Sequence, residues 1–182
     1  MDPECGKMSP NEKTMKDLDR FILKIELKSK EDEIFSLQLN RLISVNTNEY
    51  LESETLRRYE LTKTIFPKDF TYHNYHNIYR KLINNCFLVN SEFDKTIGFA
   101  LYEMNSIILK HSCLPNAFVD FDGNFLNLKS RLNIKDRGQV TISFVDKSLS
   151  YHVRNKELFQ KFGFSCTCFA CSEFTRLRDN LN

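Results

Sequence analysis

The chain has 182 residues, which is enough for one domain of ordinary size. Hydrophobic residues make up 41% of the sequence and charged residues 27%, so the composition predicts a folded core and excludes a disordered chain. A formal net charge of +2 gives no reason to expect direct nucleic-acid binding. No run of about 18 apolar residues is present, so we expect no membrane span.

The first residues, 1–11, are polar and contain Pro3, Gly6 and Pro10, so we expect a flexible leader there. This leader lacks the apolar stretch of a secretory signal. We therefore expect a protein that is not secreted and that lies in a reducing compartment, which is the nucleus, the cytoplasm or both.

The part of the chain up to residue 97 has a mainly helical pattern. A first helix is predicted to begin near Glu12, because apolar residues then recur at steps of three and four. Residues 35–42 form a short apolar segment whose type the pattern leaves open. Residues 53–64 predict a helix with Ser53 as a candidate N-cap, and residues 72–87 predict another. The apolar faces of the first and last helices carry Met15, Leu18, Ile22 and Ile25, and then Tyr75, Tyr79, Leu82 and Cys86.

A β region follows Gly98. Residues 116–121 and 124–129 predict two short strands rich in Phe, Val and Leu. Asp122 and Gly123 lie between them, and this dipeptide readily adopts the positive φ angles of a tight hairpin turn. The pattern therefore predicts a β-hairpin.

Two further elements are predicted before the end of the chain. Residues 139–145 alternate between apolar and polar side chains, which is typical of a half-buried strand. Residues 150–162 predict a helix whose apolar face holds Leu158, Phe159 and Phe162.

Cysteines gather near the C-terminus in the run Cys-Thr-Cys-Phe-Ala-Cys at residues 166–171. Thiolates at this spacing can converge on one zinc ion, which prefers four ligands in a tetrahedron. The alternative is that these are ordinary buried thiols, but three cysteines within six residues argue against chance. The fourth ligand is open on spacing alone, with Cys113 the natural choice and His111 and Cys86 as alternatives.

The cysteine run has a partner motif upstream, His-Ser-Cys-Leu-Pro-Asn at residues 111–116. Several other features stand between and before the two motifs in a definite order. They are Asn-Asn-Cys-Phe at 84–87, Gly98, Leu-Tyr at 101–102, the hairpin at 118–128, Lys-Asp-Arg-Gly at 135–138, a strand ending at Asp146, a helix with Arg154 near its start, and an aromatic entry at 162–168.

This order resembles the SET domain and post-SET zinc tail of the protein-lysine methyltransferase family, and most of all the SET-and-MYND group with its fungal relatives. The resemblance covers roughly residues 75–173. It implies an α+β fold in which a β core of short strands forms a pseudoknot, and it implies Cys113, Cys166, Cys168 and Cys171 as the ligands of a structural zinc ion. The expected parts are a leader at 1–11, a helical insert-like region at 12–97, the C-terminal SET core at 98–162, the zinc tail at 163–174 and a polar C-terminus at 175–182.

The resemblance also implies a function and a set of site residues. The family transfers a methyl group from S-adenosylmethionine to a lysine of a histone or another protein. By position, the cofactor would be contacted by Asn85, Lys110, His111 and Phe164, and the lysine channel would be lined by Phe87, Phe144 and Phe162, with Phe144 at the position of the catalytic tyrosine. The expected partner is a protein substrate, and we expect a monomer.

The sequence departs from the family pattern at sites that matter for catalysis. Lys110 stands where the family has an asparagine, and it adds a positive charge near the cofactor's ammonium group. Phe144 and Phe162 stand where the family has tyrosines, so an orienting hydroxyl is lost at Phe144, a change that can cost on the order of 10²-fold in rate. No opening strand with Gly-x-Gly and no MYND module is seen before Glu12.

These departures argue against methyl transfer by this chain and leave two main functional hypotheses, ranked above a third, a zinc-binding domain of unrelated function. One is a working lysine methyltransferase with substituted site residues. The other is a catalytically degenerate or truncated SET relative that acts as a zinc-stapled protein-interaction module.

Overall fold

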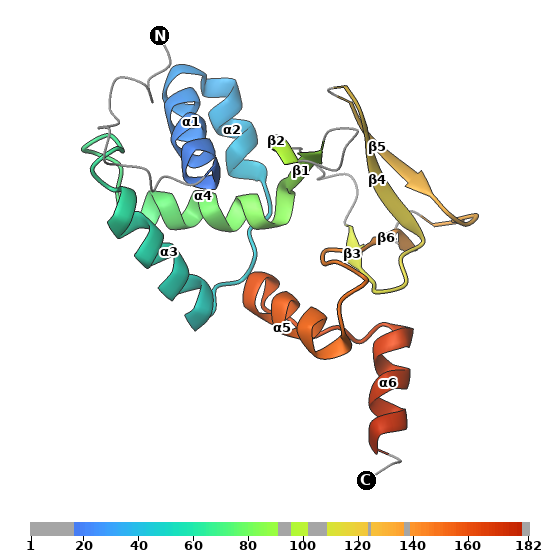
Figure 1. Cartoon of the computed structure of the whole chain (residues 1–182). Coiled ribbons are helices and arrows are strands. Elements are labelled where there is room, and N and C mark those ends of the chain that lie inside the picture. The colour runs from blue at the N-terminus through green and yellow to red at the C-terminus, as the bar shows by residue number, and fades with distance from the viewer. Residues whose placement is uncertain (1–16, 91–95, 102–108, 124, 137–138, 180–182) are drawn as a thin grey trace. The chain divides into compact units, whose positions relative to one another are not determined.

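The structure is a computed structural model that describes residues 17–90, 96–101, 109–123, 125–136 and 139–179 (Figure 1). The chain divides into two compact units, Met1–Glu103 and Met104–Asn182. The predicted start of the first helix at Glu12 lies outside the described residues.

Helices dominate the first unit, and three of them follow a residue whose side chain caps the helix. Asp32 accepts a hydrogen bond from the Phe35 N–H, Asn48 accepts one from Leu51, and Thr71 forms a reciprocal capping box with Asn74. The elements are α1 (Asp17–Glu31), α2 (Glu33–Arg41), α3 (Glu49–Thr62), α4 (Tyr72–Asn85), β1 (Cys86–Asn90) and β2 (Thr96–Leu101).

Three expectations from the sequence can be compared with the structure of this unit. The open segment at 35–42 is helical, as part of α2. Ser53 as the N-cap was wrong, because Asn48 caps α3 and Ser53 lies within the helix. The helix predicted over 72–87 was too long at its end, because residues from Cys86 onward pair with β2 as antiparallel strand β1.

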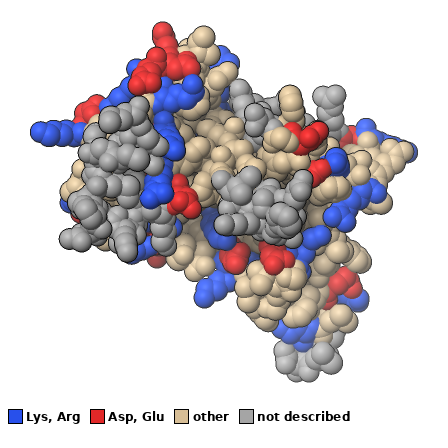
Figure 2. Space-filling view, turned by 45° about the horizontal axis from the view of Figure 1, so that its top comes forward, with Lys and Arg blue, Asp and Glu red and all other residues tan. Residues whose placement is uncertain are grey.

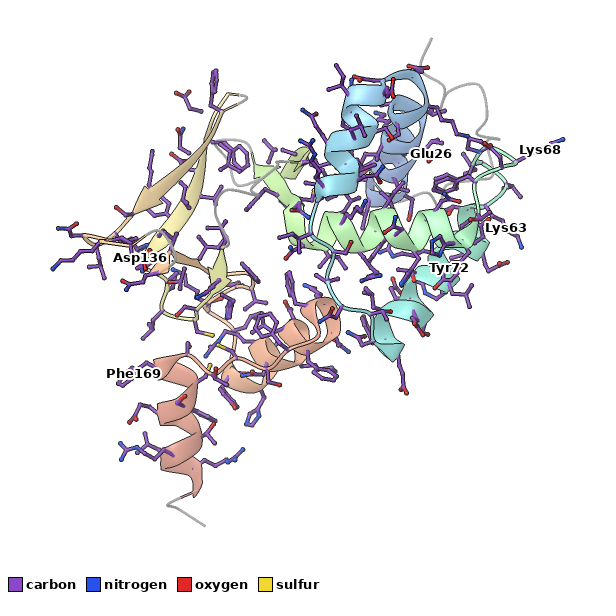
Figure 3. The ribbon with its side chains drawn as sticks, turned by 180° about the vertical axis from the view of Figure 1, so that it is seen from behind. Glu26, Lys63, Lys68, Tyr72, Asp136 and Phe169 are labelled. Carbon is purple, nitrogen blue, oxygen red and sulfur yellow. The ribbon has the colours of Figure 1, made fainter. Side chains whose placement is uncertain are left out.

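The core of the first unit lies between α1, α3 and α4 and contains a buried polar network. Ile22 and Tyr75 are fully buried. The Tyr75 hydroxyl donates a 2.5 Å hydrogen bond to the Asp19 carboxylate, and Arg58 lies 3.4 Å from the same carboxylate. Tyr72 lies at the start of α4 (Figure 3). Its hydroxyl lies 3.1 Å from the Thr55 hydroxyl. Buried polar groups of this kind are tolerated because each has a partner.

The second unit begins with short strands. β4 (Ala117–Asp122) and β5 (Phe125–Ser130) form an antiparallel hairpin, and Gly123 in the turn has a φ of 55°. The predicted hairpin is therefore confirmed. β3 (Lys110–His111) pairs in parallel with β6 (Thr141–Ile142), and this pairing brings the His-Ser-Cys motif beside the segment that contains Phe144.

The strand predicted over 139–145 was mostly wrong, because only Thr141 and Ile142 form a ladder. Beyond Ile142 the backbone uses other partners. The Phe144 N–H donates to the imidazole of His111, and the Ser143 hydroxyl donates to the Val145 carbonyl. These local bonds replace the ladder that alternation alone would predict.

Two helices complete the second unit, α5 (Tyr151–Phe162) and α6 (Phe169–Asp179). α5 follows Ser150 and ends at Gly163, whose φ of 76° suits the left-handed C-cap. Leu158 is fully buried, as predicted, but Phe159 is 55% exposed, so its placement on the buried face was wrong. Phe169 lies in the first turn of α6 and is 75% exposed (Figure 3).

The predicted fold class is confirmed, since helices and short strands are mixed and a cysteine-rich segment follows them. The pseudoknot threading and the domain boundaries stay predictions. Basic and acidic side chains are interspersed on the face that Figure 2 shows. Within the described residues, no helix combines the length and apolar character needed to cross a bilayer.

Candidate metal centre

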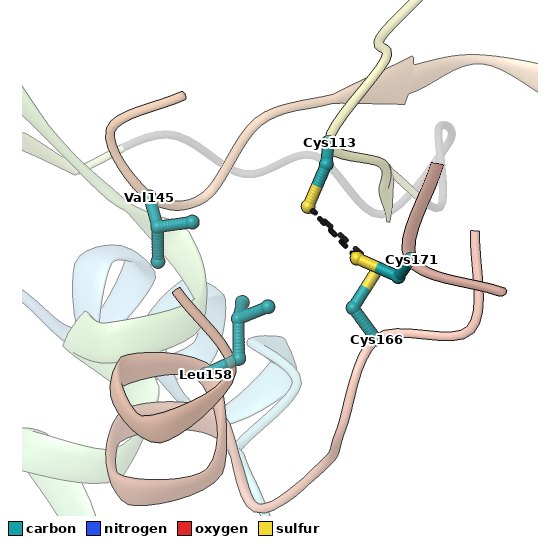
Figure 4. Packing of buried hydrophobic residues seen from close by; sticks show 5 residues of the cluster. All are labelled: Cys113, Val145, Leu158, Cys166 and Cys171. Atoms are coloured by element: carbon teal, nitrogen blue, oxygen red, sulfur yellow. Dashed lines mark hydrogen bonds between the residues drawn. The ribbon is translucent and has the colours of Figure 1, made fainter. Parts of the chain in front are cut away.

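Four cysteine thiols converge in the second unit. The sulfur atoms of Cys113, Cys166, Cys168 and Cys171 all lie within 4.8 Å of one another. Cys113 follows β3, Cys166 and Cys168 lie in the segment between α5 and α6, and Cys171 lies in the first turn of α6. Figure 4 shows three of these thiols approaching from separate parts of the chain. The structure thus brings together all four cysteines that the resemblance implied as ligands.

The spacing of the sulfurs matches a zinc tetrahedron. Cys113 Sγ lies 3.9 Å from Cys166 Sγ and 3.6 Å from Cys171 Sγ. With Zn–S bonds of about 2.3 Å, the edges of a tetrahedron of sulfurs are about 3.8 Å long. The four thiols can therefore hold a zinc ion with little rearrangement. Four protein ligands leave no position for water, which is the arrangement of a structural site.

Backbone hydrogen bonds shape the cysteine run around the cluster. The Cys168 N–H points at Cys166 Sγ over 3.4 Å, and the N–H groups of Cys171 and Ser172 both donate to the Cys168 carbonyl over 2.9 Å. Burial by itself would raise the pKa of the Cys168 thiol. Backbone N–H groups of Cys171 and Cys113 outweigh that effect and lower the pKa to about 6, which favours the thiolate that zinc requires.

Cys113 receives two side-chain donors from outside the cysteine run. Arg154 on α5 donates from Nε to Cys113 Sγ over 3.3 Å, and its guanidinium also bonds the Leu149 carbonyl. His111 Nε2 lies 3.4 Å from the same sulfur. A zinc ion with four thiolates carries a formal charge of −2, so a cation and an N–H donor at one sulfur are complementary to it.

The imidazole of His111 is held on both of its nitrogens. The Phe144 backbone N–H donates to Nδ1 over 3.1 Å, so the proton of the neutral ring is on Nε2, which faces Cys113. Burial, together with the nearby Arg154 cation, lowers the pKa of His111 to about 4, which keeps the ring neutral at physiological pH.

An aromatic cluster adjoins the buried cluster that contains three of the thiols. Its ring centroids are 5.4 Å apart for His111 and Phe144, 5.0 Å for Phe144 and Phe162, 6.1 Å for His111 and Phe164, and 6.3 Å for Phe162 and Phe164. The half-buried rings of Phe144, Phe162 and Phe164 pack on a buried cluster of three thiols and two aliphatic residues. Figure 4 shows the five members of this buried cluster: Cys113, Cys166, Cys171, Val145 and Leu158.

The remaining predicted site residues are Lys110, Asn85 and Phe87. Lys110 is exposed in β3, where it pairs with Thr141. Asn85 and Phe87 belong to the first unit. The Asn85 amide is buried and donates to the carbonyls of Ile43 and Lys81 over 2.8 and 2.7 Å. Phe87 is half-buried in β1.

Sequence reasoning missed the part that Asn155 plays at this centre. Its Oδ1 accepts a 2.7 Å hydrogen bond from the Cys166 N–H, and its Nδ2 lies 4.0 Å from Cys171 Sγ. Arg154 was noted only as a position in the motif order, not as a donor to Cys113. A single polar residue on a helix carries no signal of such a contact, which depends on the folded chain.

Known proteins provide an independent comparison. No protein-family model matches the chain. It is 39% identical over 94 residues to SET domain and MYND-type zinc finger protein 6 of Schizosaccharomyces pombe, a match that covers 50% of this chain and 19% of that protein. It is 32% identical over 93 residues to the human histone-lysine N-methyltransferase SMYD3, covering 51% and 22% of the two chains.

A longer match is found with a SET domain-containing protein of Acanthamoeba polyphaga mimivirus, which is 27% identical over 177 residues, 86% of this chain and 67% of the viral one. The matches to the yeast and human proteins span only about one fifth of those relatives' length. Together with the α+β fold and the four-cysteine cluster, these matches identify the chain as a relative of the SET-domain methyltransferases.

Proposed function

We propose that this chain contributes the C-terminal SET core and zinc tail of a protein-lysine N-methyltransferase that uses S-adenosylmethionine. The observation that carries the proposal is the packing of Phe144, Phe162 and Phe164 on the buried cluster that contains three of the four converging thiols. Three rings that the family resemblance implies for the cofactor and the lysine channel are thereby gathered at one place. Relatives named as histone-lysine methyltransferases support the same activity.

Zinc would have a structural part in this site. It would be held by Cys113, Cys166, Cys168 and Cys171. This ligation would join the segment after β3 to the start of α6. Because half-buried rings pack on the cluster that contains three of these thiols, loss of the metal would loosen the aromatic cluster as well.

Phe164 offers the clearest fit to the cofactor within the second unit. Its half-buried ring lies beside His111 and Phe162 and presents an apolar surface on which an adenine can stack. S-adenosylmethionine supplies an electrophilic methyl group. Exposed Lys110 would lie near the charged end of that cofactor by family position, and its positive charge would weaken rather than strengthen binding.

Phe144 and Phe162 would act on the substrate lysine. Their centroids are 5.0 Å apart, and apolar rings exclude water from an amine that must lose its proton before it can attack the methyl group. The faces of such rings also favour the positive methylammonium that develops. The chain's contribution is therefore positioning and desolvation, with no hydroxyl at Phe144.

The partner would be a protein that presents a lysine, a histone or another protein. We propose a monomer that does not bind nucleic acid directly and that works in the nucleus, the cytoplasm or both. The near-neutral net charge and the mixed surface charges fit a protein partner better than a polyanion.

A second candidate function is a zinc-stapled module that binds proteins without methylating them. Phe144 favours it, because a phenyl ring at the position of the family's tyrosine retains the packing and lacks the catalytic hydroxyl. Under this proposal the aromatic cluster only forms a hydrophobic core that stabilises the cysteine-rich tail.

The experiment that decides between the two candidate functions measures the melting temperature of the zinc-loaded chain at increasing concentrations of S-adenosylmethionine. A ligand that binds only the folded state stabilises it by about 2.7 kcal/mol at a hundredfold excess over its dissociation constant. We expect a saturable rise that is lost in Phe164→Leu and retained in Phe169→Leu, a change at an exposed ring on α6. Transfer of labelled methyl groups to histones would then test the reaction. No rise in a folded, zinc-loaded chain would contradict cofactor binding and favour the second candidate.

A further inference from the structure

The two ring nitrogens of His111 contact two different parts of the second unit. One ring nitrogen, Nδ1, accepts a 3.1 Å hydrogen bond from the Phe144 backbone N–H, and the other, Nε2, lies 3.4 Å from the sulfur of Cys113. An imidazole nitrogen that accepts an N–H carries no proton, so the neutral ring has its proton on Nε2 and donates it toward the sulfur.

The Phe144 N–H depends on this imidazole because of where β6 ends. The parallel ladder between β3 and β6 stops at Ile142, whose carbonyl accepts from Ser112. Phe144 is two residues further on, where the backbone has left the ladder. Phe144 is half-buried, and an N–H that is left unpaired away from water is costly.

The rings around His111 would respond to its position. The Phe144 ring lies 5.4 Å from the imidazole, the Phe164 ring lies 6.1 Å from it on another side, and the Phe162 ring lies 5.0 Å from that of Phe144. A shift of the imidazole would therefore move the rings that the proposed function assigns to the lysine channel and the adenine.

We infer that His111 is a positioning residue that ties the Phe144 backbone to the zinc ligand Cys113, so that the metal determines where the Phe144 ring stands. This inference rests on the zinc ligation and the lysine channel proposed above. It assigns to the side chain of His111 a role toward the metal centre, whereas the family resemblance implied contact with the cofactor.

Two substitutions can separate the two halves of the link. In His111→Asn, the amide oxygen can occupy the place of Nδ1 and still accept from Phe144, while the donor to the sulfur is lost. In His111→Gln, the amide nitrogen can reach the place of Nε2 and still donate to Cys113, while the acceptor for Phe144 is lost. The same two substitutions at His73, an exposed residue of α4 in the first unit, serve as controls.

The donor half is tested on the cobalt-substituted chain, whose thiolate-to-metal absorption reports on the sulfurs. A hydrogen bond stabilises the lone pairs of a thiolate, so its loss moves this absorption to lower energy. We expect the shift in His111→Asn, and a spectrum close to that of the original chain in His111→Gln and in both His73 variants. Identical spectra for both His111 variants and the original chain would overturn the donor half.

The acceptor half is tested by amide hydrogen exchange at Phe144 in the zinc-loaded chain. We expect exchange to speed up by tenfold or more, an order-of-magnitude expectation for a freed amide, in His111→Gln and to stay slow in His111→Asn. Equal protection in the two variants would overturn this half. If cobalt fails to bind the original chain, the zinc ligation fails instead, so the two failures are distinguishable.

The coupling itself is tested by replacing zinc with cadmium, a larger ion that has the same charge and also prefers thiolates. We expect the Phe144 amide resonance to shift on this exchange in the original chain, and to shift by less than half as much in His111→Asn, which lacks the link to the sulfur. A shift of equal size in both would show that Phe144 senses the metal by another route, and the inference would be wrong.

Discussion

Arg154 and Cys113 lie 41 residues apart in the sequence and are joined by a 3.3 Å hydrogen bond from the guanidinium Nε to the sulfur. The bond connects the first turn of α5 to the residue that follows β3 by two positions. A cation at this sulfur offsets part of the negative charge of a zinc ion with four thiolates. Outer contacts of this kind orient the ligands and adjust the affinity for the metal.

Replacing Arg154 with methionine should weaken zinc binding by about 10- to 100-fold, because the charge and the N–H donor are lost while much of the side-chain volume stays. Competition with a chromophoric chelator measures the affinity. Lys156→Met, at an exposed position on the same helix, should leave it unchanged. Equal affinity in Arg154→Met and the original chain would show that the contact has no part in holding the metal.

Replacing Cys168 with serine should lower the zinc content and destabilise the second unit, since a hydroxyl is a poor substitute for a thiolate at a zinc site. The matched control is Cys86→Ser in β1, a half-buried thiol of the first unit outside the four-cysteine cluster. Metal analysis of both purified chains makes the comparison. Full zinc content in Cys168→Ser would contradict its assignment as a ligand.

Replacing Phe144 with tyrosine should increase the methyl transfer proposed above, because it restores a hydroxyl where the family has one, and such an oriented group is worth on the order of 10²-fold in rate. Labelled methyl incorporation into protein substrates provides the measurement. Phe159→Tyr, at a 55% exposed ring on α5, should have no effect. A folded, cofactor-binding Phe144→Tyr chain with no gain would argue against the alignment of this position.

Replacing Tyr75 with phenylalanine should destabilise the first unit by about 1–3 kcal/mol, because the buried Asp19 carboxylate loses a hydrogen-bond donor. Burial, and then the bond to Asp19, raise the pKa of Tyr75, so its hydroxyl stays protonated and able to donate. Urea unfolding followed by helical circular dichroism measures the change. Tyr50→Phe, at an exposed ring of α3, should be close to neutral, and equal stability of the two variants would contradict the prediction.

Replacing Glu54 with glutamine should reduce the loss of stability in acid. The hydrogen bond from Arg57, with a further one from Arg58, lowers the pKa of Glu54 against the opposing effect of burial. A carboxyl with a lowered pKa contributes stability above its unfolded pKa of about 4.3 and loses it as the pH falls through the folded value. Unfolding free energies between neutral pH and pH 3 should therefore converge for Glu54→Gln and the original chain. The control is Glu31→Gln, at an exposed position where α1 ends, and convergence there as well would argue against a specific role.

Local features of the sequence predicted a good part of the fold. Gly123 beside Asp122 indicated the hairpin, and the close spacing of Cys166, Cys168 and Cys171 indicated a metal cluster. Such features are readable because the residues concerned are neighbours in the chain, and the physical reason for each lies within a few residues.

The features that the sequence did not predict depend on contacts between residues that are distant in the chain. Alternation over 139–145 predicted a longer strand, but the N–H of Phe144 found its acceptor on His111, which lies 33 residues away. The side-chain amide of Asn155 accepts a hydrogen bond from the Cys166 N–H, 11 residues further along the chain. No sequence pattern predicts this contact. Phe159 is apolar and yet exposed, so hydrophobicity alone did not identify the buried face of α5.

The separation of Cys113 from Cys171 by 58 residues has a consequence for the order of events during synthesis. At about 5–20 residues per second, the ribosome needs about 3–12 s after adding Cys113 before it adds Cys171. All residues of helices α1 to α4 have been added to the chain before that interval begins. A zinc ion held by all four thiols can therefore be enclosed only after Cys171 has been made.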